Sequence, residues 1–132
     1  MTYQDRVVAC RIDYQQLLDS IGLTEDDVQA VMTSTYAEGL LDVPLDKVEV
    51  RDSLIAGCGV YATRNITAHE TIALGASGLR GTAAARYTNH SPDPNAIAQQ
   101  QGMERYFVAL QGILEGEEIT VNYRQVLKMI YS

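Results

Sequence analysis

The chain has 132 residues, of which 46% are hydrophobic and 20% are charged, so it suits a single globular domain with a modest core. Its formal net charge of −7 argues against binding to a nucleic-acid backbone, which needs clustered Lys and Arg. We expect neither a membrane span nor a secretory signal, because the sequence has no apolar run of membrane length and its N-terminus has no hydrophobic core followed by small residues. The two cysteines are too few for a disulfide framework or a four-ligand zinc site. We therefore expect a metal-free cytoplasmic protein.

The first 46 residues are predicted to form a helical segment. Apolar residues at helical spacing before Gly22 indicate a helix over 13–21. Thr24 is followed by three acidic residues, a pattern typical of a helix N-terminus, and Gly39 is a suitable C-terminal stop. These signals predict a second helix over 25–38.

From Lys47 onward the apolar pattern changes to the alternation typical of strands. We predict strands near residues 47–51, 60–62, 71–74, 105–110 and 119–121, and a short helix over 124–132. The predicted organisation is an α+β, mainly β protein: a helical segment over 1–46, a core over 47–124 and a tail over 125–132.

Three segments carry the chemistry. They are G-C-G-V-Y-A at Gly57–Ala62, R-Y-T-N-H-S-P-D-P-N at Arg86–Asn95, and G-E-E-I-T-V-N-Y at Gly116–Tyr123. The second segment is stiff, because its Asn, Ser and Asp side chains bond their own backbone in turns and each proline fixes a torsion. In this order the three segments resemble the SET-domain family of protein lysine methyltransferases, and the resemblance extends over about residues 47–123.

The resemblance implies a fold of short curved sheets with a pseudoknot, in which the last strand passes under the N-H-S loop. Tyr123 would then lie against Asn89 and His90. The implied activity is transfer of a methyl group from S-adenosylmethionine to a lysine side chain of a protein. The acidic chain suits a substrate with an exposed basic, lysine-containing segment, and neither a nucleic acid nor a membrane is expected as a direct partner. Many acidic proteins, however, carry such charge only for solubility. The small core resembles that of bacterial or viral members, so we expect the compartment to be the cytoplasm, or the interior of a host cell if the protein is viral.

The resemblance also implies roles for particular residues. Tyr123 would be the catalytic residue, with its hydroxyl at the base of the lysine channel, although it also fits a core tyrosine that ends a strand. The residues implied to bind the cofactor are Gly57, Cys58, Gly59, Val60, Arg86, Asn89 and His90. Structural alternatives remain open at this point: the glycines fit an ordinary turn, His90 fits a structural hydrogen bond, and Arg86 fits an ion pair with Glu118.

The chain departs from the family in two places. Only residues 75–85 separate the third predicted strand from the R-x-x-N-H-S segment, where members of the family carry a longer insert that forms a wall of the substrate groove. The cysteine-rich zinc segment that often follows the final tyrosine is also missing. We therefore expect the N-terminal helices either to cover the groove or to pair two subunits as a homodimer. Two other functions stay open: a non-catalytic SET-fold interaction module, and methylation of a small molecule or of a protein terminus.

Overall fold

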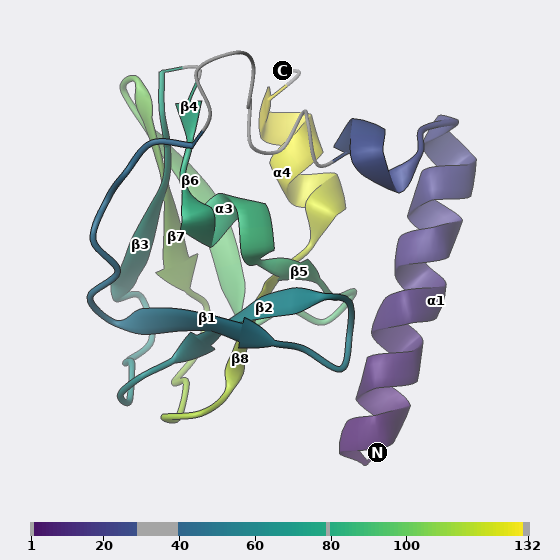
Figure 1. Cartoon of the computed structure of the whole chain (residues 1–132), viewed down its shortest axis with the longest axis horizontal. Helices are drawn as coiled ribbons and strands as arrows, with labels where there is room; N and C mark the ends of the chain where they lie inside the picture. The colour runs from purple at the N-terminus through teal and green to yellow at the C-terminus, as the bar shows by residue number, and fades with distance from the viewer. Residues whose placement is uncertain (1, 29–39, 79, 131–132) are drawn as a thin grey trace.

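The computed structural model describes residues 2–28, 40–78 and 80–130. They form a mainly β body of two four-stranded sheets with short helices, and a long N-terminal helix stands along one side of this body (Figure 1). The predicted α+β, mainly β class is confirmed. Among the described residues, no helix is long and apolar enough to cross a membrane.

The first helix, α1 (Tyr3–Ile21), begins ten residues before the predicted start at residue 13. Its N-terminus is a capping box, in which the Asp5 amide donates to Thr2 Oγ1 at 3.1 Å and the Thr2 amide donates to Asp5 Oδ2 at 3.0 Å. The pair Thr2 and Asp5 is a signal in the sequence that the prediction missed. Gly22, at a φ of 69°, ends the helix as predicted.

The second predicted helix lies largely outside the described residues. Residues 25–28 are helical, and Thr24 and Asp27 exchange hydrogen bonds of 3.0 and 3.2 Å between the backbone amide of each and the side chain of the other. The predicted N-cap at Thr24 is therefore present, while the remainder of 25–38 stays a prediction.

One sheet has the order β1-β2-β8-β5, with β1 at Val48–Asp52, β2 at Cys58–Ala62, β8 at Glu118–Val121 and β5 at Asn89–His90. The other has the order β4-β3-β7-β6, with β4 at Arg80–Gly81, β3 at Thr71–Ser77, β7 at Glu104–Ala109 and β6 at Ala96–Gln101. Neighbouring strands are antiparallel except for β5 and β8, which are parallel. The five predicted strands correspond to β1, β2, β3, β7 and β8.

The strands β4, β5 and β6 were not predicted. In β6, Ala96 and Ala98 point into the core, whereas residues 99–101 are exposed glutamines. An apolar run of three residues, Ala96 to Ala98, followed by three glutamines gives no alternating apolar signal. The pairing with β7 supplies the strand instead. The two-residue strands β4 and β5 are too short to carry any periodic pattern.

The short segment that stands in place of the longer family insert contains regular structure. β3 runs to Ser77, β4 pairs back onto it, and α3 (Ala83–Tyr87) follows. Thr82 caps this helix, and its hydroxyl also donates to the Leu74 carbonyl at 2.6 Å. This bond ties the start of α3 to β3 and so places the N-H-S segment that comes next.

The loop that follows β5 is hydrogen-bonded to β8. Asn95 donates to the Glu118 carbonyl and accepts from the Thr120 amide, both at 2.9 Å. The Ser91 amide donates to the Val121 carbonyl at 3.0 Å. The predicted packing of the last strand against the N-H-S loop is therefore confirmed. The largest fully buried side chains of the described residues include Val60, Ile66, Phe107, Ile113, Ile119, Val121, Tyr123 and Val126.

The C-terminal helix α4 (Tyr123–Ile130) confirms the predicted helix after the last strand. The Gln125 side-chain amide donates to the Ala98 carbonyl at 3.0 Å and accepts from the Ala98 amide at 3.2 Å. These two bonds fix α4 to β6, and the helix begins at the residue predicted to be catalytic.

Candidate functional site

Tyr123 lies where β8 gives way to α4, and its side chain is 2% exposed. Its hydroxyl donates to the Thr88 carbonyl at 2.7 Å, and its backbone amide donates to His90 Nδ1 at 3.0 Å. The parallel pairing of β5 with β8 brings these groups together across about thirty residues of sequence. The predicted contact of Tyr123 with the N-H-S segment is thus present in atomic detail.

His90 is held from both of its ring nitrogens. Nδ1 accepts the Tyr123 amide, so it carries no proton, and the proton of the neutral ring lies on Nε2. Nε2 donates to Asp13 Oδ2 at 2.6 Å, which links the N-H-S segment to α1. The His90 side chain is 1% exposed, so neither bond competes with bulk water.

Burial lowers the pKa of His90 below its usual 6.5, and the nearby positive charge of Arg124 acts in the same direction, whereas Asp13 partly opposes the shift. Burial raises the pKa of Asp13, but hydrogen bonds from Arg124 and His90 outweigh this effect and lower it overall. His90 is therefore neutral and Asp13 is ionised at neutral pH. Arg124 Nη1 lies 2.6 Å from the same Asp13 oxygen that accepts from His90.

Asn89 fastens the G-x-G turn to the N-H-S segment. Its side-chain amide lies 3.2 Å from each of the carbonyls of Ala56 and Cys58, and 2.8 Å from Glu118 Oε2. Glu118 also accepts from the hydroxyls of Ser53 and Tyr61. The first, second and third motifs therefore meet at one cluster of polar contacts.

The two glycines of the first motif serve different purposes. Gly57 has a φ of 44°, and a Cβ built there meets no atom within 4 Å, so the turn needs its conformation and leaves open space beside it. A Cβ at Gly59 would lie 2.3 Å from Glu118 Oε2, so Gly59 makes room for that carboxylate. The prediction placed both glycines against the cofactor; the space at Gly59 belongs to Glu118.

A cavity of about 180 Å³ lies beside this turn. Four of the seven residues predicted to bind the cofactor line it, namely Gly57, Cys58, Arg86 and Asn89, together with Glu25, Asp26, Ala56 and Tyr87. Gly59, Val60 and His90 do not line it. Val60 is 1% exposed in the core and pairs with Ile119, and the His90 ring is covered by α1.

The ion pair considered between Arg86 and Glu118 is not found among the ion pairs of the described residues. The donors to the Glu118 carboxylate are instead neutral groups of Ser53, Tyr61 and Asn89. The Arg86 side chain is exposed at the cavity, with its guanidinium carbon 6.0 Å from the centre of the Tyr87 ring.

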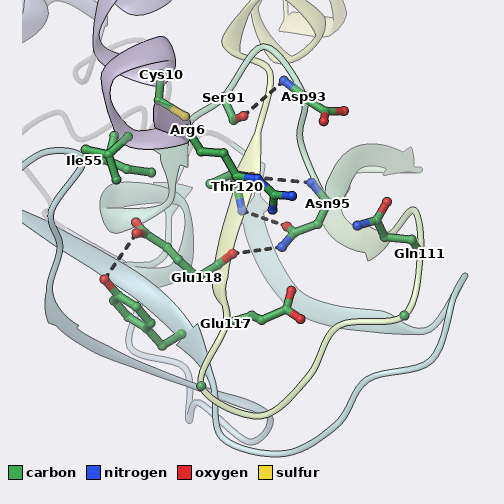
Figure 2. Close-up of a pocket in the computed structure, with 14 residues that line it drawn as sticks. Arg6, Cys10, Ile55, Ser91, Asp93, Asn95, Gln111, Glu117, Glu118 and Thr120 are labelled. Carbon is green, nitrogen blue, oxygen red and sulfur yellow. Dashed lines mark hydrogen bonds between the residues drawn. The ribbon is translucent and has the colours of Figure 1, made fainter. Parts of the chain in front are cut away.

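A second cavity, of about 620 Å³, lies between α1 and β8 (Figure 2). Arg6 and Cys10 reach it from α1, and Glu118 and Thr120 reach it from β8. Burial raises the pKa of the Cys10 thiol there, so the thiol is protonated at neutral pH. None of the predicted site residues lines this cavity.

The structure adds three residues to the site that the sequence interpretation missed: Asp13, Tyr14 and Arg124. The Tyr14 ring centre lies 5.3 Å from that of Tyr123 and 5.8 Å from that of His90. The spacing of Tyr14 predicts only that it belongs to the apolar face of a helix, and it gives no sign of what that face meets. Asp13 and Arg124 match no local motif, because their partners lie 77 and 111 residues away.

Comparisons with known proteins support the motif-based resemblance. A family model described as SET domain matches residues 73–124. A Plasmodium falciparum structure described as a candidate histone methyltransferase is 19% identical over 61% of this chain and 95% of its own, with a TM-score of 0.48. The methyltransferase domain of human PR domain-containing protein 2 is 18% identical over 61% of this chain and 78% of its own, with a TM-score of 0.49. A comparison with curated protein sequences found no significant match. The resemblance to the SET-domain family is confirmed for the matched residues, and it supports a methyltransferase activity in general terms.

Proposed function

Residues 73–124 match the SET domain, and from this premise we propose that the protein transfers a methyl group from S-adenosylmethionine to a lysine side chain of a protein substrate. One observation carries the proposal. Three distant segments meet: the G-x-G turn and the N-H-S segment share a cavity, and the buried Tyr123 hydroxyl is bonded to Thr88 in the same segment.

The smaller cavity suits part of this cofactor. Its volume of about 180 Å³ is below the ~300 Å³ at the lower end of whole ligand pockets, so it would hold one end of the molecule. The amino-acid end carries a carboxylate and an ammonium group. Arg86 would pair with the carboxylate, while Glu25 and Asp26 would pair with the ammonium. The open space at Gly57 lets the backbone approach closely.

Methyl transfer to an amine is an in-line displacement, and S-adenosylmethionine supplies the electrophilic methyl group. The Tyr123 hydroxyl donates its proton to the Thr88 carbonyl, and its oxygen would act as the acceptor for an N–H of the incoming amine. This orients the nitrogen lone pair without making the tyrosine a base. A lysine must be neutral to react, and desolvation in a closed site lowers its pKa from about 10.4. The burial of Tyr123 would keep water away from an amine that reached its hydroxyl.

The partner that we propose is a protein with an exposed basic segment around the target lysine, which the net charge of −7 favours. The competing function is a SET-fold module that binds proteins without transferring methyl groups. The shortness of the segment over 75–85 favours that alternative, because it leaves less protein to build a substrate wall.

The first test is calorimetric titration of the full chain with S-adenosylmethionine and with its demethylated product. Saturable binding that Arg86→Ala weakens would support the cavity as the cofactor site. Methylation of lysine-containing peptides with basic flanks, followed by mass spectrometry, then tests transfer. Tyr123→Phe should reduce turnover while binding of the cofactor persists; loss of binding as well would show that Tyr123 acts only through the fold. Absence of binding at millimolar cofactor would favour the interaction module.

A further inference from the structure

Helix α1 reaches the N-terminus of α4 through one carboxylate. Asp13 Oδ2 accepts from His90 Nε2 and from Arg124 Nη1, each at 2.6 Å. His90 Nδ1 in turn accepts the backbone amide of Tyr123. A continuous chain of hydrogen bonds therefore runs from the N-terminal helix to the residue that carries the proposed chemistry.

The groups at the two ends of this series of hydrogen bonds decide which atom donates and which accepts at each step. A backbone amide can only donate, so His90 Nδ1 must be unprotonated to accept it. An ionised carboxylate can only accept, so Nε2 must carry the proton. With Asp13 removed, the buried Nε2–H would lose its acceptor, and the alternative tautomer would place a proton on Nδ1 against the Tyr123 amide. The Tyr123 amide favours the same tautomer, and Asp13 supplies the acceptor without which the buried Nε2–H would be unsatisfied. Asp13 thereby stabilises the tautomer on which the bond to Tyr123 depends.

We infer that Asp13 is a positioning residue of the site. By holding His90 in one tautomer, Asp13 fixes the backbone of Tyr123. Helix α1, which carries Asp13, is therefore part of the site. This inference rests on the proposed function for its kinetic consequence. The structural part of the inference, that Asp13 stabilises one tautomer of His90, can be tested whether or not the protein transfers methyl groups.

Two further contacts favour the same conclusion. Tyr14, the next residue of α1, sets its ring at 87° to that of Tyr123 and also contacts the ring of His90. Arg124 is the residue that follows Tyr123, so Asp13 holds the first turn of α4 directly as well as through His90. Asp13, Tyr14, Tyr123 and Arg124 are the polar or charged groups that the described contacts place around the imidazole.

Positioning matters here because an in-line transfer tolerates little displacement. A shift of about 1 Å at a reacting group can cost on the order of a hundredfold in rate. We expect Asp13→Ala to lower kcat by about tenfold to a hundredfold. The Kd for S-adenosylmethionine should change by less than about threefold, since Asp13 does not line the smaller cavity. A residue that only stabilised the fold would not separate kcat from binding in this way.

The direct test is a long-range proton–nitrogen NMR spectrum of the full, ¹⁵N-labelled chain at pH 7.5. The chain has two histidines, so His90→Gln assigns the signals. Wild-type His90 should show an unprotonated Nδ1 and a protonated Nε2. Asp13→Ala should shift both signals toward a mixture of tautomers. Asp13→Asn retains an acceptor oxygen and should keep the wild-type pattern and most of the turnover.

Asp19→Ala is the matched control, because it makes the same change as Asp13→Ala on an exposed residue of the same helix that bonds only Gln15 among the described hydrogen bonds. It should alter neither the spectrum nor kcat.

A proton on Nδ1 in the wild type would overturn the inference without any variant, which guards against a misfolded Asp13→Ala protein. An unchanged His90 spectrum in Asp13→Ala would also overturn it. Loss of the tautomer with unchanged kcat would refute the positioning role while the proposed function stands. Absence of methyl transfer by the wild type would instead refute the proposed function, and the spectrum would still decide the tautomer.

Discussion

Gly59→Ala is the substitution whose effect the structure determines most directly. The added Cβ would lie 2.3 Å from Glu118 Oε2 and 2.9 Å from Ser53 Cβ, both shorter than real Cβ contacts. The carboxylate cannot swing away freely, because Ser53 Oγ donates to it at 2.8 Å and Asn89 Nδ2 donates to it at 2.8 Å. The substitution therefore forces either a strained contact or the weakening of these bonds.

The loss in the free energy of unfolding can be estimated either from the strained contact or from the weakened hydrogen bonds. Overpacking of a well-filled site costs about 1–3 kcal/mol, and each hydrogen bond to a charged group contributes roughly 1.5–3 kcal/mol. Because Glu118 is only partly buried and can relax in part, we expect a loss of about 3 kcal/mol in the free energy of unfolding. For 132 residues the unfolding entropy is about 0.28 kcal/mol/K, so Tm should fall by about 10 °C.

The assay is urea unfolding followed by circular dichroism, with Gly57→Ala as the control. Nothing lies within 4 Å of a Cβ at Gly57, so only its φ of 44° opposes the alanine, at a cost of about 1–2 kcal/mol. In a Glu118→Ala background, Gly59→Ala should cost less than in the wild type, because the nearest clashing atom is gone. The reasoning about Glu118 would be wrong if Gly59→Ala proved no more destabilising than Gly57→Ala. It would also be wrong if the free-energy losses of Gly59→Ala and Glu118→Ala were additive in the double variant.

Three other outcomes can be measured on the same protein. Burial lowers the pKa of His90 below 6.5, so the unfolded chain takes up this proton first as the pH falls. The free energy of unfolding should then be constant above about pH 6.5 and decrease below it, by at most ~1.4 kcal/mol per pH unit, until the pH reaches the folded pKa. His90→Gln should remove this slope in urea titrations, and an unchanged slope would contradict the assignment. Asn95→Ala removes two hydrogen bonds to β8, one buried and one partly buried, and should cost about 2–4 kcal/mol by thermal unfolding; a change under 1 kcal/mol would argue against the packing of this loop on β8. His69 has a φ of 71°, so His69→Gly should keep or raise the free energy of unfolding by up to about 1 kcal/mol, and a clear loss would count against that backbone conformation.

Much of the core is predictable from local patterns. The strand β1 is recognisable because its apolar residues alternate, and β7 is recognisable because it is rich in β-branched and aromatic residues. The three motifs are recognisable because turns and close approaches need particular residues. Their resemblance to a known family predicts the contact between Tyr123 and His90 that the fold contains. The strand β6 is not predictable in this way, because pairing with β7, rather than its own composition, makes it a strand.

What the sequence by itself determined is therefore the set of strands with a strong period, the helix caps and the motif chemistry, since these depend on neighbours a few residues away. Only the tertiary structure decided which residues complete the site. Asp13 bonds His90 across 77 residues, and nothing in its local sequence distinguishes it from Asp19, which lies fewer than two turns further along the same helix. The apolar face of α1 predicts that one side of the helix is buried, but the packing of the whole chain decides which residues that side contacts.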